Sequence, residues 1–232
     1  EFSQQQRIPV VADIISNFHP VYSAIKHPEV FLGRDAPVEL QPDLLITFGL
    51  SVVSKNLKIF LRNHRPQAHW HIQPDGRVAD TFQSLTRILP TSPKFFFRLA
   101  NNWHGKSQNT YDQAWQTWEK EANEKLSSFF ISSKAKASEF YAVSVVLNNL
   151  PQRSSLYLAN SMAVRYANLI GLSSNCLAVE VIANRGTSGI DGSSSTAVGA
   201  ALASPNKLHV LITGDLAFFY DRNAFWHNYP LP

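Results

Sequence analysis

Residues 184–220 read NRGTSGIDGSSSTAVGAALASPNKLHVLITGDLAFFY, and this stretch decides the fold that we expect. An apolar segment, 177–183, precedes it and is typical of a buried strand. After the glycine-rich turn, the small and hydroxyl-bearing residues 193–203 favour a helix that packs closely on a sheet. The β-branched segment 208–213 then predicts a second strand. Strand, helix and strand in this order predict a parallel sheet.

The glycine-rich turn and the helix after it have the composition of an anion-binding site. The first N–H groups and the positive dipole end of a helix favour phosphate, and glycines allow it to approach. Asp215 follows the next strand and suits a Mg²⁺ ligand beside a phosphate. An equal interpretation is that Asp215 is the N-cap of a helix that begins at Leu216.

The first hundred residues predict a second α/β region. Strands are expected at 42–49 and 68–73, with a helix from Ser51 to Asn63 between them and another helix within 75–89. The remaining expected elements are a strand at 8–15, short helices within 18–31, helices at 111–130, 138–150 and 162–170, and a strand at 155–159.

The segment 91–108 is rich in Ser, Pro, Asn and Gly and has no clean hydrophobic period, so we expect a loop there. We place a domain boundary in it, which gives domains 1–100 and 101–232. The predicted fold class is α/β, with two three-layer domains whose mainly parallel sheets are flanked by helices.

Composition indicates a globular protein. Of 232 residues, 44% are hydrophobic, and the net charge of +4 is scattered without a basic run, which argues against a nucleic-acid surface. No apolar run is long enough to span a membrane. The single cysteine, Cys176, cannot form an internal disulfide, and we interpret it as a small buried hydrophobic residue. These features favour a cytoplasmic location.

Three histidines lie close together in the sequence, at His64, His69 and His71. The last two are expected on one face of a strand. A metal site would need further ligands that the sequence does not locate, so we interpret the pair as surface or interface histidines and expect no zinc.

Two strings resemble a known family. NRGTSGIDG at 184–192 and GDLAFFYDRNAFW at 214–226 resemble the thiamine diphosphate enzymes, most closely the synthases of menaquinone biosynthesis. The shared pattern combines NRG-x-SGIDG, a GD dipeptide on the following strand, and a D-x-NA group that is here Asp221, Asn223 and Ala224. The GD dipeptide alone occurs in unrelated folds, whereas the combination is specific.

The resemblance implies which parts of such an enzyme this chain contains. Residues 1–100 resemble the central domain without its first elements, and 101–232 resemble the first part of the pyrophosphate-binding domain, so both domains are incomplete. The pyrimidine-binding domain of the family, and the strand with an Asn-Asn-Gly string that completes its metal site, have no counterpart here. We therefore expect a fragment that is inactive alone and binds cofactor weakly or not at all.

The resemblance also implies a cofactor, thiamine diphosphate with Mg²⁺ or Mn²⁺. Asp215 resembles the metal-binding aspartate, and Ile190 resembles the bulky residue that holds the cofactor in its bent, reactive form. The general base would be a glutamate from the absent domain of a second subunit, which implies a homodimer or tetramer. The positions that correspond to the cofactor-binding residues are Ser188, Gly189, Ile190, Asp191, Gly214, Asp215 and Leu216.

The substrates implied by the resemblance are 2-oxoglutarate and isochorismate. Decarboxylation of the first and addition of the succinyl-semialdehyde carbanion to the second would give 2-succinyl-5-enolpyruvyl-6-hydroxy-3-cyclohexene-1-carboxylate. Guanidinium groups suit these carboxylates. One departure is Asn56, where the resemblance leads us to expect an arginine after Lys55. The matching substrate-binding positions are Asn160, Ser161, Arg165, Arg185 and Lys55.

Two alternatives remain open. One is a non-catalytic α/β module that binds a phosphate or nucleotide through 186–196, although the chain has neither GxGxxG nor a G-K-[ST] string. The other is a different thiamine enzyme, such as an acetolactate synthase, against which the NS-x-x-VR and NRG-x-SGIDG strings argue.

Overall fold

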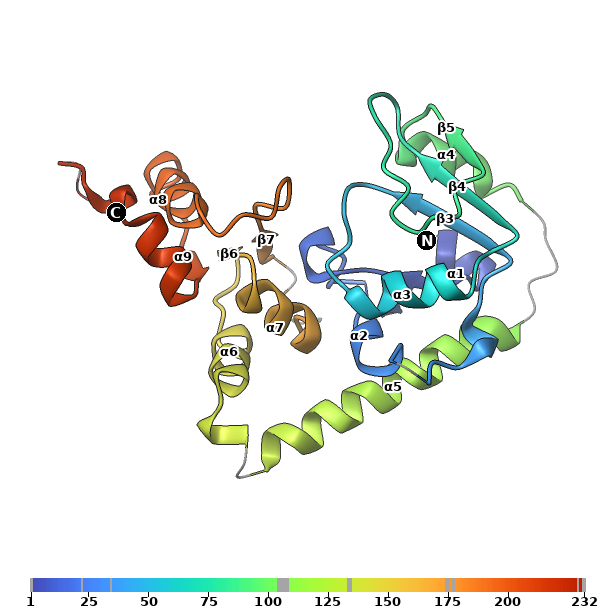
Figure 1. Cartoon of the computed structure of the whole chain (residues 1–232), viewed down its shortest axis with the longest axis horizontal. Helices are drawn as coiled ribbons and strands as arrows, with labels where there is room; N and C mark the ends of the chain where they lie inside the picture. The colour runs from blue at the N-terminus through green and yellow to red at the C-terminus, as the bar shows by residue number, and fades with distance from the viewer. Residues whose placement is uncertain are drawn as a thin grey trace. The chain divides into compact units, whose positions relative to one another are not determined.

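The chain forms two compact units (Figure 1). Unit 1 comprises Glu1–Val11 and Pro28–Ala122, and unit 2 comprises Ala12–His27 and Asn123–Pro232. The computed structural model describes residues 2–21, 23–33, 35–103, 109–132, 135–173, 176, 178–228 and 230.

Unit 1 is built around a three-stranded parallel sheet with the order β3-β4-β5. One cluster of the apolar core of unit 1 joins this sheet to a helix, because the buried residues Ile72, Phe96 and Ala100 pack together. Its elements are α1 (Phe2–Gln6), β1 (Val10–Val11), α2 (Pro28–Phe31), η2 (Val38–Leu40), β3 (Leu44–Phe48), α3 (Lys55–Asn63), β4 (Ala68–Ile72), β5 (Arg87–Leu89), α4 (Pro93–Ala100) and the first part of α5 (Asn109–Ile131).

Unit 2 also has a three-stranded parallel sheet, but its order is β7-β6-β8. All four residues of the central strand β6 are buried, as expected of a strand covered on both faces. Its elements are η1 (Ile14–Ser16), β2 (Ala24–Ile25), the end of α5, η3 (Ala135–Ala137), α6 (Glu139–Asn148), β6 (Ser155–Leu158), α7 (Met162–Ile170), β7 (Glu180–Ile182), α8 (Ser193–Ala203), β8 (His209–Ile212), α9 (Asp215–Tyr220) and η4 (Arg222–Phe225).

The structure confirms the predicted fold class, α/β with parallel sheets flanked by helices. The predicted helix at 162–170 coincides with α7, and the helix that begins at Ser193 coincides with α8. Cys176 is a free, buried thiol, as expected. Leu177, the first residue of one predicted strand, lies outside the described residues, and the described strand there is β7.

The helix expected within 75–89 is absent from those residues, all of which are described, and only the strand β5 forms there. The reason is local hydrogen bonding. The Asp80 carboxylate accepts bonds from the N–H groups of Ser84 at 3.2 Å and Leu85 at 3.1 Å, and Gln83 has a positive φ of 57°. An aspartate that bonds to nearby backbone N–H groups stabilises a turn and competes with the helix.

The loop expected across 91–108 is wrong for its first part, where α4 forms. Ser92 is the N-cap of this helix and accepts a hydrogen bond from the N–H of Phe95 at 3.2 Å, and Pro93 occupies the first turn. Serine followed by proline is a strong helix-start signal. This signal explains why a helix forms where a loop was expected. Residues 104–108 lie outside the described part.

Other predicted elements are shorter in the structure. The strand expected at 8–15 is limited to β1 and is followed by the 3-10 turn η1, and the helices expected within 18–31 reduce to α2, preceded by the short strand β2. The helix expected from Ser51 begins at Lys55, because Ser54 is its N-cap and accepts the N–H of Leu57 at 3.1 Å.

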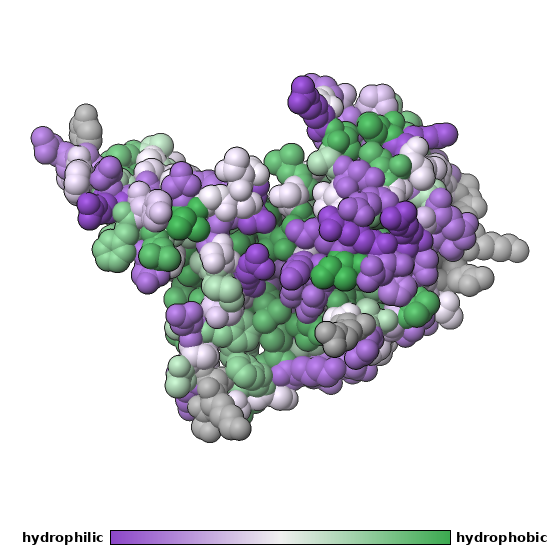
Figure 2. Space-filling view, in the orientation of Figure 1, coloured by the Kyte–Doolittle hydropathy of each residue, from purple (hydrophilic) through white to green (hydrophobic). Residues whose placement is uncertain are grey.

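The chain passes from one unit to the other after Val11, after His27 and, within α5, after Ala122. The predicted domain boundary near residue 100 concerns the domains of the enzyme family and stays a prediction. Figure 2 shows apolar side chains gathered over α6 and α7. These two helices carry the exposed apolar residues Val145, Val146 and Met162. Among the helices that are described, none is both long and apolar enough to cross a membrane.

Candidate cofactor and substrate site

Three strand ends of unit 2 meet at one edge of its sheet. In the parallel register Tyr157 of β6 pairs with Ile182 of β7, and Leu158 of β6 pairs with Ile212 of β8. The segments that follow β6, β7 and β8 therefore leave the sheet side by side. In open α/β sheets this carboxyl edge is where ligands bind.

Asn160 joins the segments that follow β6 and β7. Its side chain is buried, and its Nδ2 donates to the carbonyl oxygens of Asn184 at 2.7 Å and Gly189 at 2.6 Å. Its Oδ1 accepts a hydrogen bond from Nη1 of Arg185 at 2.8 Å. Both donors of the amide are thus used within the chain, so Asn160 fixes the glycine-rich turn and orients a guanidinium group.

The glycine-rich turn, 184–192, is also closed at its far end. Nδ2 of Asn184 donates to the carbonyl oxygen of Gly192 at 3.2 Å and to Oγ1 of Thr196 at 2.9 Å. Gly192 is the N-cap of α8 and has φ +77°, a left-handed conformation that favours glycine. The sequence NRG-x-SGIDG therefore folds into a turn whose two ends are held by asparagine side chains.

Ile190 is the apolar member of this turn. It packs, with Ile212, against a small buried cluster of Ala159, Ala163 and Ala217. These alanines come from the end of β6, from α7 and from α9. The small side chains leave room for the two isoleucines, and the contact gives Ile190 a fixed support.

The N-terminus of α8 is occupied by a carboxylate of the chain. Asp221, which is buried, accepts hydrogen bonds from the N–H of Ser195 at 2.6 Å and from its Oγ at 2.5 Å. The hydroxyl oxygens of Ser193 and Ser194 are buried, without hydrogen-bond partners in the described part of the chain. The sequence predicted an anion at the N-terminus of this helix. At the third N–H group, that of Ser195, the Asp221 carboxylate takes that position.

Asp215 is the first residue of α9 and is exposed at the carboxyl edge. Its Oδ1 accepts the N–H of Leu216 at 2.7 Å. The N-cap position belongs to Gly214, so the N-cap interpretation of Asp215 is corrected by one residue. The described residues hold no group of three or more His, Cys, Asp or Glu that could bind a metal ion. The role of Asp215 as a metal ligand stays a prediction.

Ser161 and Arg165 are placed by α7. Ser161 precedes the helix with φ 70° and ψ −127°, a strained conformation for a residue other than glycine. Both residues are exposed, and their spacing of four puts them on the same side of the helix start. The structure thus brings Ser161, Arg165, Arg185 and Asp215 to the carboxyl edge of one sheet.

Lys55 belongs to unit 1, where it is the first residue of α3 and is exposed. Its neighbour Asn56 donates its backbone N–H to Glu29 Oε2 at 3.1 Å and its Nδ2 to the Glu29 carbonyl at 2.9 Å. Asn56 therefore contributes to the start of α3. That Lys55 joins the unit 2 residues in one site stays a prediction.

The histidine pair of unit 1 belongs to a hydrogen-bonded chain. Thr47 Oγ1 lies 2.8 Å from both His69 Nε2 and His71 Nδ1, so the two rings share one face of the strand, as expected. Gln73 Nε2 donates to the carbonyl of Asp75, so the amide atom that faces His71 is Oε1. This oxygen can only accept, so His71 Nε2 is the donor. The surface interpretation is wrong for His69, which is buried.

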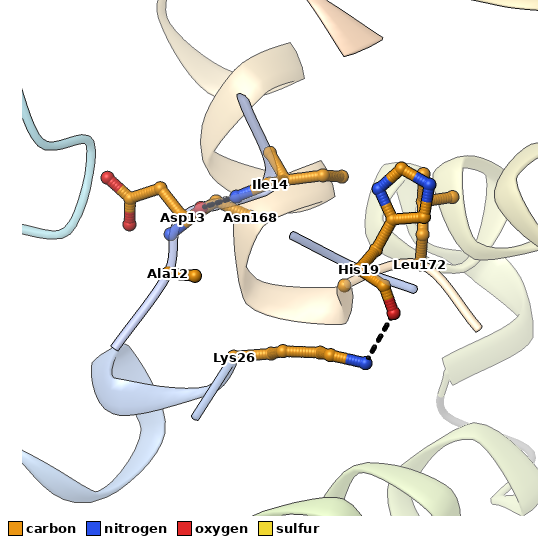
Figure 3. A pocket seen from close by; sticks show the side chains of 8 residues that line it. Ala12, Asp13, Ile14, His19, Lys26, Asn168 and Leu172 are labelled. Carbon is orange, nitrogen blue, oxygen red and sulfur yellow. Dashed lines mark hydrogen bonds between the residues drawn. The ribbon is translucent and has the colours of Figure 1, made fainter. Parts of the chain in front are cut away.

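Two small cavities occur in unit 2. One, of about 10 Å³, lies beneath α8 and is lined by residues that include Asn184, Ser193 and Thr196. The other, also of about 10 Å³, lies between the segment 12–26 and the end of α7, where Lys26 donates to the carbonyl of His19 (Figure 3). Each has room for about one water molecule, so neither is a cofactor pocket.

Sequence reasoning missed the role of Asp221 and of the Asn184 side chain. The D-x-NA string contains Asp221 but does not show which helix this carboxylate caps. A cap supplied by a residue 26 positions away is a tertiary contact. No local sequence pattern signals it.

Comparison with known proteins identifies the class. A family model described as the middle domain of thiamine pyrophosphate matches residues 1–158. The chain therefore belongs to this family of thiamine pyrophosphate enzymes.

The most similar relatives found include three bacterial proteins named 2-succinyl-5-enolpyruvyl-6-hydroxy-3-cyclohexene-1-carboxylate synthase. The protein of Cytophaga hutchinsonii is 43% identical over 229 residues, which cover 96% of this chain and 40% of that protein. That of Flavobacterium psychrophilum is 38% identical over 96% of this chain and 40% of its own length. That of Bacteroides fragilis is 43% identical over 81% of this chain and 32% of its own length. The chain spans about 40% of the length of the first two relatives.

Proposed function

We propose that this chain supplies part of the active site of a transferase of menaquinone (vitamin K2) biosynthesis that depends on thiamine diphosphate and Mg²⁺ or Mn²⁺. The enzyme decarboxylates 2-oxoglutarate and joins the remaining four-carbon unit to isochorismate, which gives 2-succinyl-5-enolpyruvyl-6-hydroxy-3-cyclohexene-1-carboxylate. The observation that carries the proposal is the hydrogen-bonded joint of Asn160, Arg185 and the glycine-rich turn, at the sheet edge that also bears Asp215. The names of the relatives support the choice of reaction.

Asp215 is the residue that would hold the metal. Mg²⁺ is usually bound by one or two carboxylates together with phosphates of the ligand. Asp215 is exposed and uses Oδ1 for the N–H of Leu216, so Oδ2 can face a cation. Bound thiamine diphosphate would supply an acidic thiazolium carbon that takes up the acyl group. The fixed support beneath Ile190 lets this side chain hold the cofactor in its bent form.

The arginines are the residues that would bind the substrate carboxylates. Asn160 engages Nη1 of Arg185 and so holds the guanidinium plane in one orientation. A fixed guanidinium can pair with a carboxylate through two parallel hydrogen bonds. Arg165 supplies a second positive charge at the same edge, and the strained Ser161 presents a hydroxyl beside it. Lys55 would complete the charge in place of the arginine that Asn56 replaces.

The remaining parts of the proposal concern the protein as a whole. We propose a cytoplasmic homodimer or tetramer in which a glutamate from a second subunit acts as general base. These 232 residues alone are then inactive, because they contain neither that glutamate nor the second half of the metal site.

The geometry disfavours the alternative of a plain phosphate-binding module at 186–196. That module would use the N-terminus of α8, where the Asp221 carboxylate already accepts the N–H and hydroxyl of Ser195. A buried carboxylate at this place repels a second anion.

Calorimetric titration of thiamine diphosphate with Mg²⁺ into the full-length gene product tests the proposal. We expect Mg²⁺-dependent binding that is lost in Asp215→Ala and retained in Asp75→Ala, a matched exposed aspartate of unit 1. Tight binding that ignores both Mg²⁺ and Asp215 would instead support the phosphate-binding module. Turnover of 2-oxoglutarate and isochorismate by the 232 residues alone would contradict the expected inactivity.

A further inference from the structure

We propose that Asp221 is a positioning residue that fixes α9 against the N-terminus of α8, and so sets where Asp215 lies relative to the glycine-rich turn. The consequence for cofactor binding rests on the function proposed above. Asp221 itself is buried, and its carboxylate is bonded to Ser195.

Two short hydrogen bonds and the dipole of α8 hold the Asp221 carboxylate at the N-terminus of that helix. A buried carboxylate accepts two hydrogen bonds from one residue, at 2.6 Å from the N–H of Ser195 and at 2.5 Å from its Oγ. Hydrogen bonds to an ionised acceptor are shorter and stronger than neutral ones. The negative charge also stands at the positive end of the 11-residue helix α8. Both effects hold Asp221 in one place.

Asp221 stands at the opposite end of α9 from Asp215. It is the C-cap of this helix, which has six residues, and its N–H bonds to the carbonyl of Phe218. At about 1.5 Å per residue the helix is roughly 9 Å long. With its C-terminal end tied to α8 and its N-terminal end following β8, α9 has little freedom to rotate. The tie therefore controls the direction of the Asp215 carboxylate.

The N-terminus of α8 also contacts the glycine-rich turn. Asn184 binds the carbonyl of Gly192 and the hydroxyl of Thr196, on the first turn of α8. Ser195 and Thr196 are neighbours in the first turn of α8. This part of α8 therefore binds the glycine-rich turn through Asn184 and the end of α9 through Asp221. The N-terminus of α8 is thus the common support of both halves of the proposed cofactor site.

Unit 1 provides a matched contact for comparison. There Glu29 of α2 caps α3, because its Oε2 accepts the hydroxyl of Ser54 at 2.5 Å and the N–H of Asn56 at 3.1 Å. Both contacts are therefore a carboxylate from another helix at a helix N-terminus. Loss of either is expected to reduce stability, but only the contact of Asp221 links two segments of the proposed cofactor site.

The test uses the full-length gene product and four variants: Asp221→Ala, Ser195→Ala, the double variant and Glu29→Ala. Mg²⁺-dependent affinity for thiamine diphosphate is measured by calorimetry well below the unfolding temperature. Residues that orient metal ligands typically change affinity by roughly 10- to 100-fold, and we expect a loss in that range for Asp221→Ala. We expect the double variant to be no weaker than Asp221→Ala, because both changes remove one contact. Glu29→Ala should bind as the unaltered protein does.

Hydrogen exchange of the same variants separates this proposal from the proposed function. Asp221→Ala should raise exchange in 193–196 and in 215–220 together, with or without ligand. Unchanged exchange in 215–220, or unchanged affinity, would overturn the positioning role, as would additive losses in the double variant. If the unaltered protein binds no thiamine diphosphate, the proposed function fails, and the coupled exchange then decides the positioning role alone.

Discussion

The two units contain sheets of the same size and type that differ in strand order. In unit 1 the chain adds strands in one direction, β3-β4-β5, whereas in unit 2 the later strands β7 and β8 lie on opposite sides of β6. A change of direction in strand order separates the loops at the carboxyl edge and creates the crevice where α/β proteins bind ligands. The difference in order explains why the candidate site lies on unit 2.

The two units also differ in whether the polar groups of the sheet are bonded within the unit or exposed. In unit 1 both His69 and His71 bond to the hydroxyl of Thr47, so these polar groups are used within the unit. In unit 2 Arg165 and Asp215 are exposed. Charged groups at the carboxyl edge of unit 2 therefore remain exposed, where we propose the ligand site.

The largest expected effect on stability is that of Asn160→Ala, matched in unit 1 by Ser54→Ala, which also removes a buried polar side chain. Loss of Asn160 leaves two carbonyls and Nη1 of Arg185 without their partner, which we expect to lower the free energy of unfolding by about 3 kcal/mol. Urea unfolding followed by circular dichroism measures it. Only Asn160→Ala should also weaken substrate binding. Equal effects of both variants on substrate binding would break the comparison between the units.

A smaller effect is expected for alanine at two glycines with positive φ. Gly192 in unit 2 has φ +77° and Gly49 in unit 1 has φ +84°, and an added Cβ at either meets nothing closer than 3.7 Å. Gly192→Ala and Gly49→Ala should therefore each cost about 1–2 kcal/mol through backbone strain alone. Cofactor affinity should fall only in Gly192→Ala. A fall of similar size in Gly49→Ala would show that the site is not confined to unit 2.

The histidine chain of unit 1 predicts a loss of stability in acid. Burial lowers the pKa of His69 below its ordinary value of 6.5, which outweighs the opposing charge of Asp80, and the nearby His71 lowers it further. Protonation then favours the unfolded state, so the stability supplied by neutral His69 is present above pH 6.5 and is lost as the pH falls below it.

Urea unfolding at pH 7.5 and pH 5.5, followed by tryptophan fluorescence, measures this loss. Four tryptophans, at positions 70, 103, 115 and 118, lie in unit 1, so the signal reports mainly on that unit. The difference between the two pH values should shrink in His69→Gln. A difference unchanged by this variant would exclude His69 as the cause.

The smallest effect is expected at the amino edge of the unit 2 sheet, away from the site. Lys207 forms an ion pair with Glu180 at 2.9 Å, and its hydrogen bond and charge lower the pKa of that carboxyl. Both side chains are partly exposed, so Lys207→Ala should change stability by less than about 1 kcal/mol. Cofactor affinity should not change. A marked loss of affinity would mean that the site extends beyond the carboxyl edge.

Much of the fold was predictable because its signals are local. The apolar run before Gly214 and the helix that begins at Ser193 follow from period and composition, and both formed as expected. The helix predicted within 75–89 failed because Asp80 binds backbone N–H groups, a choice that hydrophobic spacing does not reveal. The loop predicted at α4 is wrong because the Ser92 cap and the proline after it start a helix there, although the segment lacks a clean hydrophobic period.

The candidate site was predictable as a set of segments but not as a network. The motif strings named Asn160, Arg185 and Asp215, and parallel strand order places the segments that hold them at one edge. Asn160 donates its amide to the glycine-rich turn, and Asp221 caps α8. These contacts join residues 29 and 26 positions apart. Such contacts follow from the fold and not from local sequence.

Hydrogen exchange of the unaltered full-length gene product, with and without thiamine diphosphate and Mg²⁺, tests most directly that the ligand site lies at the carboxyl edge of unit 2. We predict that the cofactor slows exchange in 184–196 and 213–221 and leaves the strands of unit 1, 44–48 and 68–72, unchanged. Slower exchange confined to unit 1, or no change in either unit despite binding, would contradict the account.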